Sequence, residues 1–180
     1  MSKRPKTRLF VIVALILGPF LGVWVAFQMG WLVIFKMAPI DAMRPTIKPG
    51  DLVLVETISY RFISPKQGDL LVFLSTGISY LEDRHYDELN LPYLQRVVAV
   101  PGDEIRIENT TLWVGDNPWE PIDYGIPVRP GAFLKENQTI VVPKDCFFVL
   151  ADAHDISQDS REWGWVPREN IFGRILVSLN

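Results

Sequence analysis

An uninterrupted apolar run near the amino terminus constrains this chain more than any other feature. From Leu9 to Phe35 the sequence carries no charged side chain. As a helix, this run would extend for roughly 40 Å, which exceeds the roughly 30 Å of a bilayer's hydrocarbon core. A cleavable signal peptide has a much shorter apolar segment, typically about 7–15 residues. The run therefore predicts an uncleaved transmembrane anchor, with Trp24 and Trp31 toward its second end, where aromatic side chains favour the membrane interface.

The basic residues around this run predict its orientation. The side chains that precede it are Lys3, Arg4, Lys6 and Arg8, with no acidic residue among them. Positive charge favours the cytoplasmic side, so residues 1–8 are predicted to be a cytoplasmic tail, 9–35 the anchor and 36–180 an extracytoplasmic domain. No second apolar run of this length follows, which predicts a single pass through the inner or plasma membrane, with membrane lipid as a partner.

The acidic net charge and the small number of cysteines and histidines exclude several classes of function. Residues 1–36 hold five of the 18 basic side chains, so the remainder sets 13 basic against 21 acidic ones, a net charge of about −8. An acidic domain is poorly suited to nucleic acid, which binds clustered Lys and Arg. The single cysteine, Cys146, cannot form an intrachain disulfide and is expected to be a buried apolar residue. The chain has only two histidines, His85 and His154, in addition to this cysteine, so we expect no metal site.

Short strands separated by turn signals dominate the rest of the chain. The pattern predicts a mostly β, antiparallel domain that is closed or nearly closed, behind one N-terminal helix. A hairpin and loop insert is expected at about 104–142, and 75–92 is expected to be a polar loop. The predicted strands are 51–56, 68–74, 94–100, 104–108, 112–114, 139–142, 146–150 and 170–179.

Four segments of this domain combine turn residues with charged ones. Taken singly, each would be interpreted as a turn that opens a strand or as a structural ion pair in a loop. The segments are Ala42-Met-Arg-Pro-Thr-Ile-Lys-Pro-Gly-Asp51, Lys66-Gln-Gly-Asp-Leu-Leu-Val-Phe73, Tyr93-Leu-Gln-Arg-Val-Val-Ala-Val-Pro-Gly-Asp103 and Ser157-Gln-Asp-Ser-Arg-Glu-Trp-Gly-Trp-Val-Pro167.

In this order, the four segments resemble the sequence boxes of type I signal peptidases. The resemblance implies a membrane-anchored β domain that acts on exported preproteins, with the secretion or assembly machinery as a further possible partner. It also implies a serine nucleophile and a neutral lysine base, and neither a metal nor an organic cofactor. The lysine of such a dyad must be buried, because burial lowers its pKa and keeps it neutral.

Both dyad positions depart from the family pattern. Ala42 stands before Met43, where the family has its serine, and Gln95 stands before Arg96, where the family has its lysine. A methyl group cannot attack a carbonyl, and a carboxamide cannot accept a proton at neutral pH. The start of the fourth box departs as well, because Ala151-Asp152-Ala153-His154 stands where the family usually has Gly-Asp-Asn. The residues expected to support the site are Met43, Pro45, Arg96, Asp152, Ser157, Asp159 and Arg161.

Three functions remain open at this point. The first is an inactive member of the family that binds signal peptides or other secreted chains at the export site. The second is an active type I signal peptidase, in which case the register has been misread or Ala42 and Gln95 are introduced changes. The third is a membrane-anchored β domain with an unrelated structural role.

Overall fold

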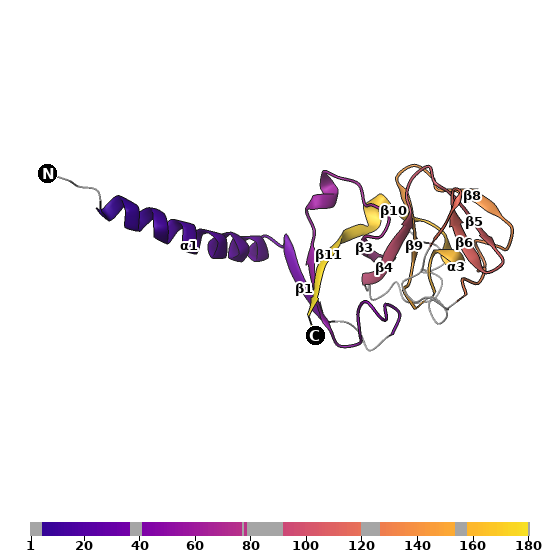
Figure 1. The fold of residues 1–180 in the computed structure, drawn as a ribbon, viewed down its shortest axis with the longest axis horizontal. Coiled ribbons are helices and arrows are strands. Elements are labelled where there is room, and N and C mark those ends of the chain that lie inside the picture. The colour runs from indigo at the N-terminus through magenta and orange to yellow at the C-terminus, as the bar shows by residue number, and fades with distance from the viewer. Residues whose placement is uncertain are drawn as a thin grey trace.

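The computed structural model describes residues 5–36, 41–76, 78, 92–119, 127–153 and 158–179, with side chains described from residue 15 onward. An N-terminal helix, α1 (Pro5–Gln28), extends away from a body made of two antiparallel sheets (Figure 1). The mostly β, antiparallel class predicted from the sequence is confirmed. Most of the polar loop predicted at 75–92 lies outside the described part of the chain, as do residues 120–126 and 154–157.

α1 ends before the apolar run does. The Gly30 N–H donates to the Phe27 carbonyl, the Trp31 N–H donates to the Ala26 carbonyl, and Gly30 has φ +68°. These features form a Schellman motif, in which a left-handed glycine terminates the helix. The end of the predicted 9–35 anchor, from Leu32 on, therefore belongs to a strand. In the part of the chain whose side chains are described, no helix is both long and apolar enough to cross a membrane.

The larger sheet carries most of the residues singled out from the sequence. All of its neighbouring strands are antiparallel. Its strand order is β1 (Leu32–Lys36), β2 (Leu52–Glu56), β11 (Ile171–Leu179), β3 (Leu70–Leu74), β4 (Pro92–Ala99), β9 (Cys146–Leu150) and β10 (Val166–Pro167). The short helices η1 (Ser59–Arg61), α3 (Ser160–Trp163) and η3 (Arg168–Asn170) connect these strands.

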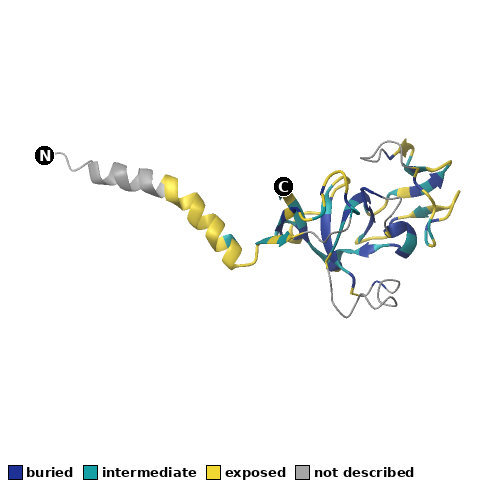
Figure 2. Cartoon of the chain, turned by 90° about the horizontal axis from the view of Figure 1, so that it is seen from below, coloured by how far each residue is buried: buried dark blue, intermediate teal, exposed yellow. Residues whose placement is uncertain are grey.

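The smaller sheet includes the hairpin predicted at 104–108 and 112–114. Its order is β7 (Asn117–Pro118), β6 (Thr111–Val114), β5 (Glu104–Glu108) and β8 (Thr139–Val141). Apolar residues of β5 and β6, such as Ile105 and Leu112, pack with Phe148 and Leu150 of β9 in a core that joins the two sheets. Buried residues therefore concentrate where the sheets meet, while α1 is exposed along its described length (Figure 2).

β11 lies between β2 and β3, although β2 and β3 are close in sequence. A Cβ atom added at Gly173 of β11 would collide with the Glu56 carbonyl oxygen of β2 and come within 2.8 Å of Val55 Cγ1. Only glycine lets the backbones approach so closely here. Irregularities in the register of β11 on both sides, at Ile171/Gly173 and Ile175/Val177, accompany this approach.

The buried Glu56 carboxylate holds the chain as it leaves β2. It accepts hydrogen bonds from the N–H groups of Ile58 and Ser59 and from the Ser59 hydroxyl, and Arg174 lies 3.3 Å away. Burial opposes ionisation, but these hydrogen bonds and the Arg174 charge outweigh it, so the pKa of Glu56 lies below its usual value. The ionised carboxylate therefore fixes the start of η1.

Replacing Glu56 by glutamine should destabilise the fold in a pH-dependent way. Near neutral pH we expect Glu56→Gln to lower the free energy of unfolding by about 1–3 kcal/mol, because charged acceptors are lost. A lowered pKa stabilises the fold above the unfolded pKa, and that contribution disappears as the pH falls through the folded pKa. Urea unfolding should thus show the stabilities of the two proteins converging as the pH falls through the lowered pKa of Glu56. Glu108→Gln, at a carboxylate that is 44% exposed, is the control. If Glu56→Gln lowered the free energy of unfolding equally at neutral and at acidic pH, the prediction would be wrong.

Candidate functional site

Ala42 begins a short helical turn that leads into β2. The Met43 and Ile47 side chains of this turn are almost fully buried, and the Ile47 N–H donates to the Met43 carbonyl at 2.8 Å. Ala42 packs partly buried against the same apolar cluster, and its carbonyl accepts a hydrogen bond from the Ala153 N–H at 2.9 Å. Pro45 is exposed on the far side of the turn. The residue predicted to correspond to the family's nucleophile is thus held by packing and a hydrogen bond, and its side chain is a methyl group.

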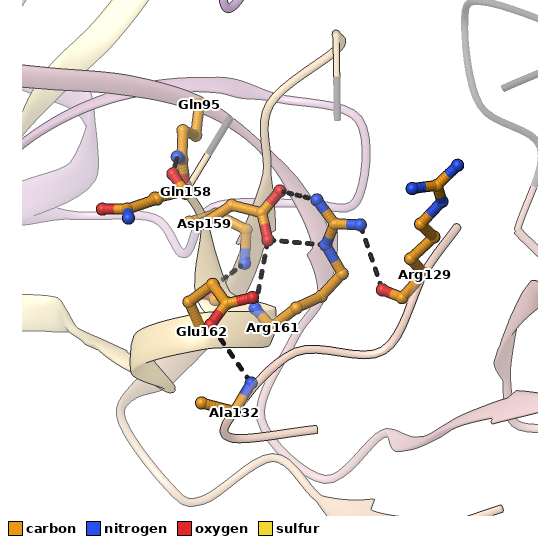
Figure 3. Close-up of polar contacts among 9 residues, drawn as sticks. Gln95, Arg129, Ala132, Gln158, Asp159, Arg161 and Glu162 are labelled. Atoms are coloured by element: carbon orange, nitrogen blue, oxygen red, sulfur yellow. Dashed lines mark hydrogen bonds and ion pairs between the residues drawn. The ribbon is translucent and has the colours of Figure 1, made fainter. Parts of the chain in front are cut away.

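Gln95 lies in β4 and is only 3% exposed. Its amide Nε2 donates to the Gln158 carbonyl at 2.8 Å, as Figure 3 shows, and Leu71 of β3 is its register partner. Its Oε1 atom is buried and has no hydrogen-bond partner among the described residues. Gln95, the residue predicted to stand at the family's base position, is therefore a neutral side chain whose amide donates one hydrogen bond and whose oxygen accepts none from the described residues.

One largely buried ion pair, Arg96–Asp152, gathers contacts from the first three sequence segments. The Arg96 guanidinium contacts both carboxylate oxygens of Asp152, through Nε and Nη2, at 2.7 Å each. Its Nη1 donates to the Gly68 carbonyl at 2.8 Å and its Nη2 donates to Thr46 Oγ1 at 3.1 Å. The Thr46 hydroxyl in turn donates to Asp152. Thr46, Gly68 and Arg96 come from the first, second and third segments, and Asp152 lies shortly before the fourth. One cluster in space therefore brings these distant parts of the chain together.

A second buried ion pair positions the fourth segment. Asp159 is fully buried, and the Arg161 guanidinium donates to its two oxygens at 2.8 Å each (Figure 3). Asp159 also caps α3 by accepting from the Arg161 N–H at 3.1 Å. Arg161 Nη1 reaches the Arg129 carbonyl at 3.1 Å, which ties this pair to the loop before β8. Burial raises the pKa of Asp159, and the Arg161 charge opposes that rise.

The structure brings most of the predicted site residues together around the segment 151–161. Ala42 contacts it at Ala153, Gln95 at Gln158, and Arg96 at Asp152. Ser157, His85 and His154 lie outside the described residues. Sequence reasoning missed Thr46 and Gly68, whose roles depend on a contact across the fold; their only signal was membership of the first two segments. In the described chain, no three His, Cys, Asp or Glu side chains gather as metal ligands.

Comparison with known proteins identifies the family. The profile described as "Signal peptidase, peptidase S26" matches residues 8–179. This chain belongs to the signal peptidase family. The resemblance drawn from the four segments is thereby confirmed at the level of the family.

Individual relatives agree with this assignment. Over 79% of this chain, it is 32% identical to "Probable signal peptidase I-2" of Synechocystis and 34% identical to "Signal peptidase I" of Leptolyngbya laminosa. The chain spans 61% and 66% of the lengths of these two signal peptidases. A crystal structure of a signal peptidase I from Enterococcus faecalis aligns with 64% of this chain and 98% of that one, at 19% identity and a TM-score of 0.45.

Proposed function

We propose that this chain is a non-catalytic member of the signal peptidase family that binds signal peptides or other exported chains without cleaving them. One observation carries the proposal: Ala42 and Gln95 occupy the positions that correspond, by the sequence boxes, to the family's nucleophile and base. Acyl transfer by a hydroxyl needs both groups. The methyl of Ala42 offers no nucleophile, and the amide of Gln95 offers no base.

The scaffold around these positions supports binding as the retained activity. The Arg96–Asp152 and Asp159–Arg161 pairs are bidentate and buried. A buried carboxylate is costly unless its partner stays in place. A domain that keeps this much buried charge in fixed geometry keeps the shape of its site, so recognition can persist where the reacting groups are absent.

The edge strand β1 offers a way to bind an extended chain. In the larger sheet β1 has a single neighbour, β2, so its other edge presents N–H and C=O groups unpaired by any described strand. An extended peptide can add to such an edge through main-chain hydrogen bonds. β1 ends at Lys36, shortly before Ala42 in the chain, and we propose its free edge as the place where the peptide binds.

The exposed surface of α1 supports a role as a membrane anchor. Large apolar side chains are exposed around the described part of this helix (Figure 2), namely Leu15, Ile16, Leu17, Phe20, Leu21, Val23, Trp24, Val25 and Phe27. An apolar surface on all sides of a helix needs a covering, and lipid provides one. We therefore place residues 1–8 in the cytoplasm, α1 from Leu9 onward in the membrane and the β domain outside.

Binding of a labelled signal peptide to the full chain in detergent tests the proposal. We expect saturable binding by fluorescence anisotropy and no cleavage product by mass spectrometry. Two peptides N-methylated at alternate residues sharpen the test, because an added strand turns every second amide toward its neighbour. One methylated peptide should lose binding and the other should keep it. Cleavage that depends on this chain would overturn the loss of catalysis, and the absence of any binding would favour a structural role instead.

A further inference from the structure

Beside the end of α1, the chain exposes an apolar tip. Phe62 is 81% exposed, the highest value for any large apolar side chain in the described chain, and Ile63 beside it is 47% exposed. A single exposed apolar residue is ordinary, but an aromatic and a β-branched residue side by side are a feature that needs an explanation.

The tip is rigidly held, so its exposure is built into the fold. The N–H groups of Phe62 and Ile63 both donate to the Ser59 carbonyl, at 2.9 and 3.0 Å. Arg168 clamps the same loop from η3: its Nη2 donates to the Tyr60 and Ile63 carbonyls, at 3.0 and 2.9 Å, and its Nη1 donates to Ser64 Oγ at 2.8 Å. The buried Tyr60 is itself fixed by its hydroxyl, which donates to Asp69 at 2.7 Å.

Hydrogen bonds place the base of this loop against the end of α1. The Thr57 N–H donates to the Trp31 carbonyl at 3.0 Å, and the Thr57 hydroxyl donates to the Gly30 carbonyl at 2.9 Å. Met29, 59% exposed, and Trp31, 37% exposed, continue the apolar surface of the helix at this point. The base of the loop that carries the tip is therefore tied to the residues that end α1.

Basic side chains border the same region. A hollow of about 960 Å³ opens between η1 and η3, and Gly30, Thr57, Arg61 and Lys144 are among its lining residues. Arg61 and Lys144 are exposed, and no described residue pairs with either charge. The hollow also holds two acidic residues, Asp145 and Glu169, together with Cys146. Burial raises the pKa of the Cys146 thiol, and the negative charges of Asp145 and Glu169 raise it further.

We infer that the Phe62–Ile63 tip inserts into the outer boundary of the bilayer that holds α1, with Arg61 and Lys144 facing lipid phosphates. Aromatic and basic side chains at the end of an apolar helix are suited to this boundary, where rings lie at the headgroup level and cations meet anionic lipid. The inference rests on the proposed anchoring by α1 and adds a second contact to it. Two contacts would restrict the tilt of the β domain over the membrane more than the connection through α1 alone.

A fluorescent reporter on the full chain in vesicles tests this contact. The environment-sensitive probe NBD would be attached to Phe62→Cys in a Cys146→Ser background, and the protein reconstituted in phosphatidylethanolamine–phosphatidylglycerol vesicles with spin-labelled lipid as quencher. Val141→Cys, on the smaller sheet and 53% exposed, is the matched control, and Leu21→Cys reports on α1. We expect severalfold stronger quenching at position 62 than at 141, and a fall in quenching at 62 when Arg61→Glu is added.

The other outcomes separate the tip from the anchor. Quenching at position 21 with equally weak quenching at 62 and 141 would overturn the tip contact and leave the anchor intact. Equal strong quenching at 62 and 141 would show unspecific adsorption of the domain and would also overturn it. If position 21 is not quenched, the anchor itself is wrong and the tip inference falls with it.

Discussion

The Ala42→Ser, Gln95→Lys double variant should cleave a preprotein that the unmodified chain leaves intact. The first change restores a hydroxyl in a turn that Met43 and Ile47 already fix, and the second restores an amine in β4. Loss of a nucleophile costs on the order of 10⁶ in turnover in a serine protease, so the gain can be very large. Cleavage of a preprotein by the purified full chain in detergent, followed by gel electrophoresis and mass spectrometry of the new terminus, measures it.

The pH dependence of this gain is also predicted. The Gln95 side chain is only 3% exposed. A lysine introduced at this position would be buried as well, and burial lowers the pKa of a lysine. Only the neutral amine can take the proton of the serine hydroxyl, so the rate should rise as the pH increases through that lowered pKa. The stability of the variant should rise over the same range, because its unfolded state binds the proton more tightly than its folded state.

The single variants are the controls for this experiment. Ala42→Ser has a nucleophile without a base, and Gln95→Lys has a base without a nucleophile, so each should remain far below the double variant. Thermal unfolding of each protein shows whether the scaffold tolerates the change. Cleavage by the unmodified chain would show that the catalytic positions are assigned wrongly. A folded double variant that does not cut would show that the scaffold has lost more than the two reacting groups.

Removing Asp159 should be among the most destabilising single changes in the domain. Asp159→Ala leaves the Arg161 guanidinium buried without its carboxylate, and breaking a buried pair in this way costs about 3–5 kcal/mol. The same change removes the cap of α3. Urea unfolding measures the loss. Asp41→Ala is the matched control, because Asp41 pairs with Arg44 at the surface, where the side chains are 37% and 59% exposed, and such pairs contribute about 0–1 kcal/mol.

A double replacement separates the ion pair from the space it fills. If the unpaired charge causes the loss, Asp159→Leu with Arg161→Met should be less destabilising than Asp159→Ala alone, since apolar residues of similar size often replace a buried pair at little cost. Arg161 also donates to the Arg129 carbonyl, so a part of the loss should remain. A double variant as unstable as Asp159→Ala would instead assign the loss to the cap and the packing.

The fold was largely predictable where local pattern decides structure. Period-two alternation and turn residues located the hairpin of β5 and β6 and the longer strands of the larger sheet. β1 was missed, because Leu32–Lys36 continues the apolar run of α1 without a change in composition. Gly30 was the one residue in the sequence that indicated the end of the helix, and a glycine within an apolar run is an ambiguous signal. The two-residue strands β7 and β10 lie below what any pattern can reveal.

The candidate site was predictable as a set of residues but not as a geometry. The order of four segments pointed to Ala42 and Gln95 and to supporting acids and arginines. The structure shows how these pair, Arg96 with Asp152 and Asp159 with Arg161. That Arg96 also binds Thr46 and the Gly68 carbonyl could not be predicted, because those contacts depend on how distant strands pack. The free acceptor of Gln95 likewise appears only once its neighbours are in place.

The insertion of β11 between β2 and β3 has a consequence for how the domain forms. β2 and β3 are synthesised early, yet they have no pairing with each other in the finished sheet, and both wait for Ile171–Leu179. Pairings between segments so far apart in sequence form slowly. If the chain crosses the membrane with its amino end first, one edge of β2 and one edge of β3 remain unpaired until β11 inserts between them. The sheet can close only after β11 has crossed, so misfolding and pairing with other chains are most probable just before that strand arrives.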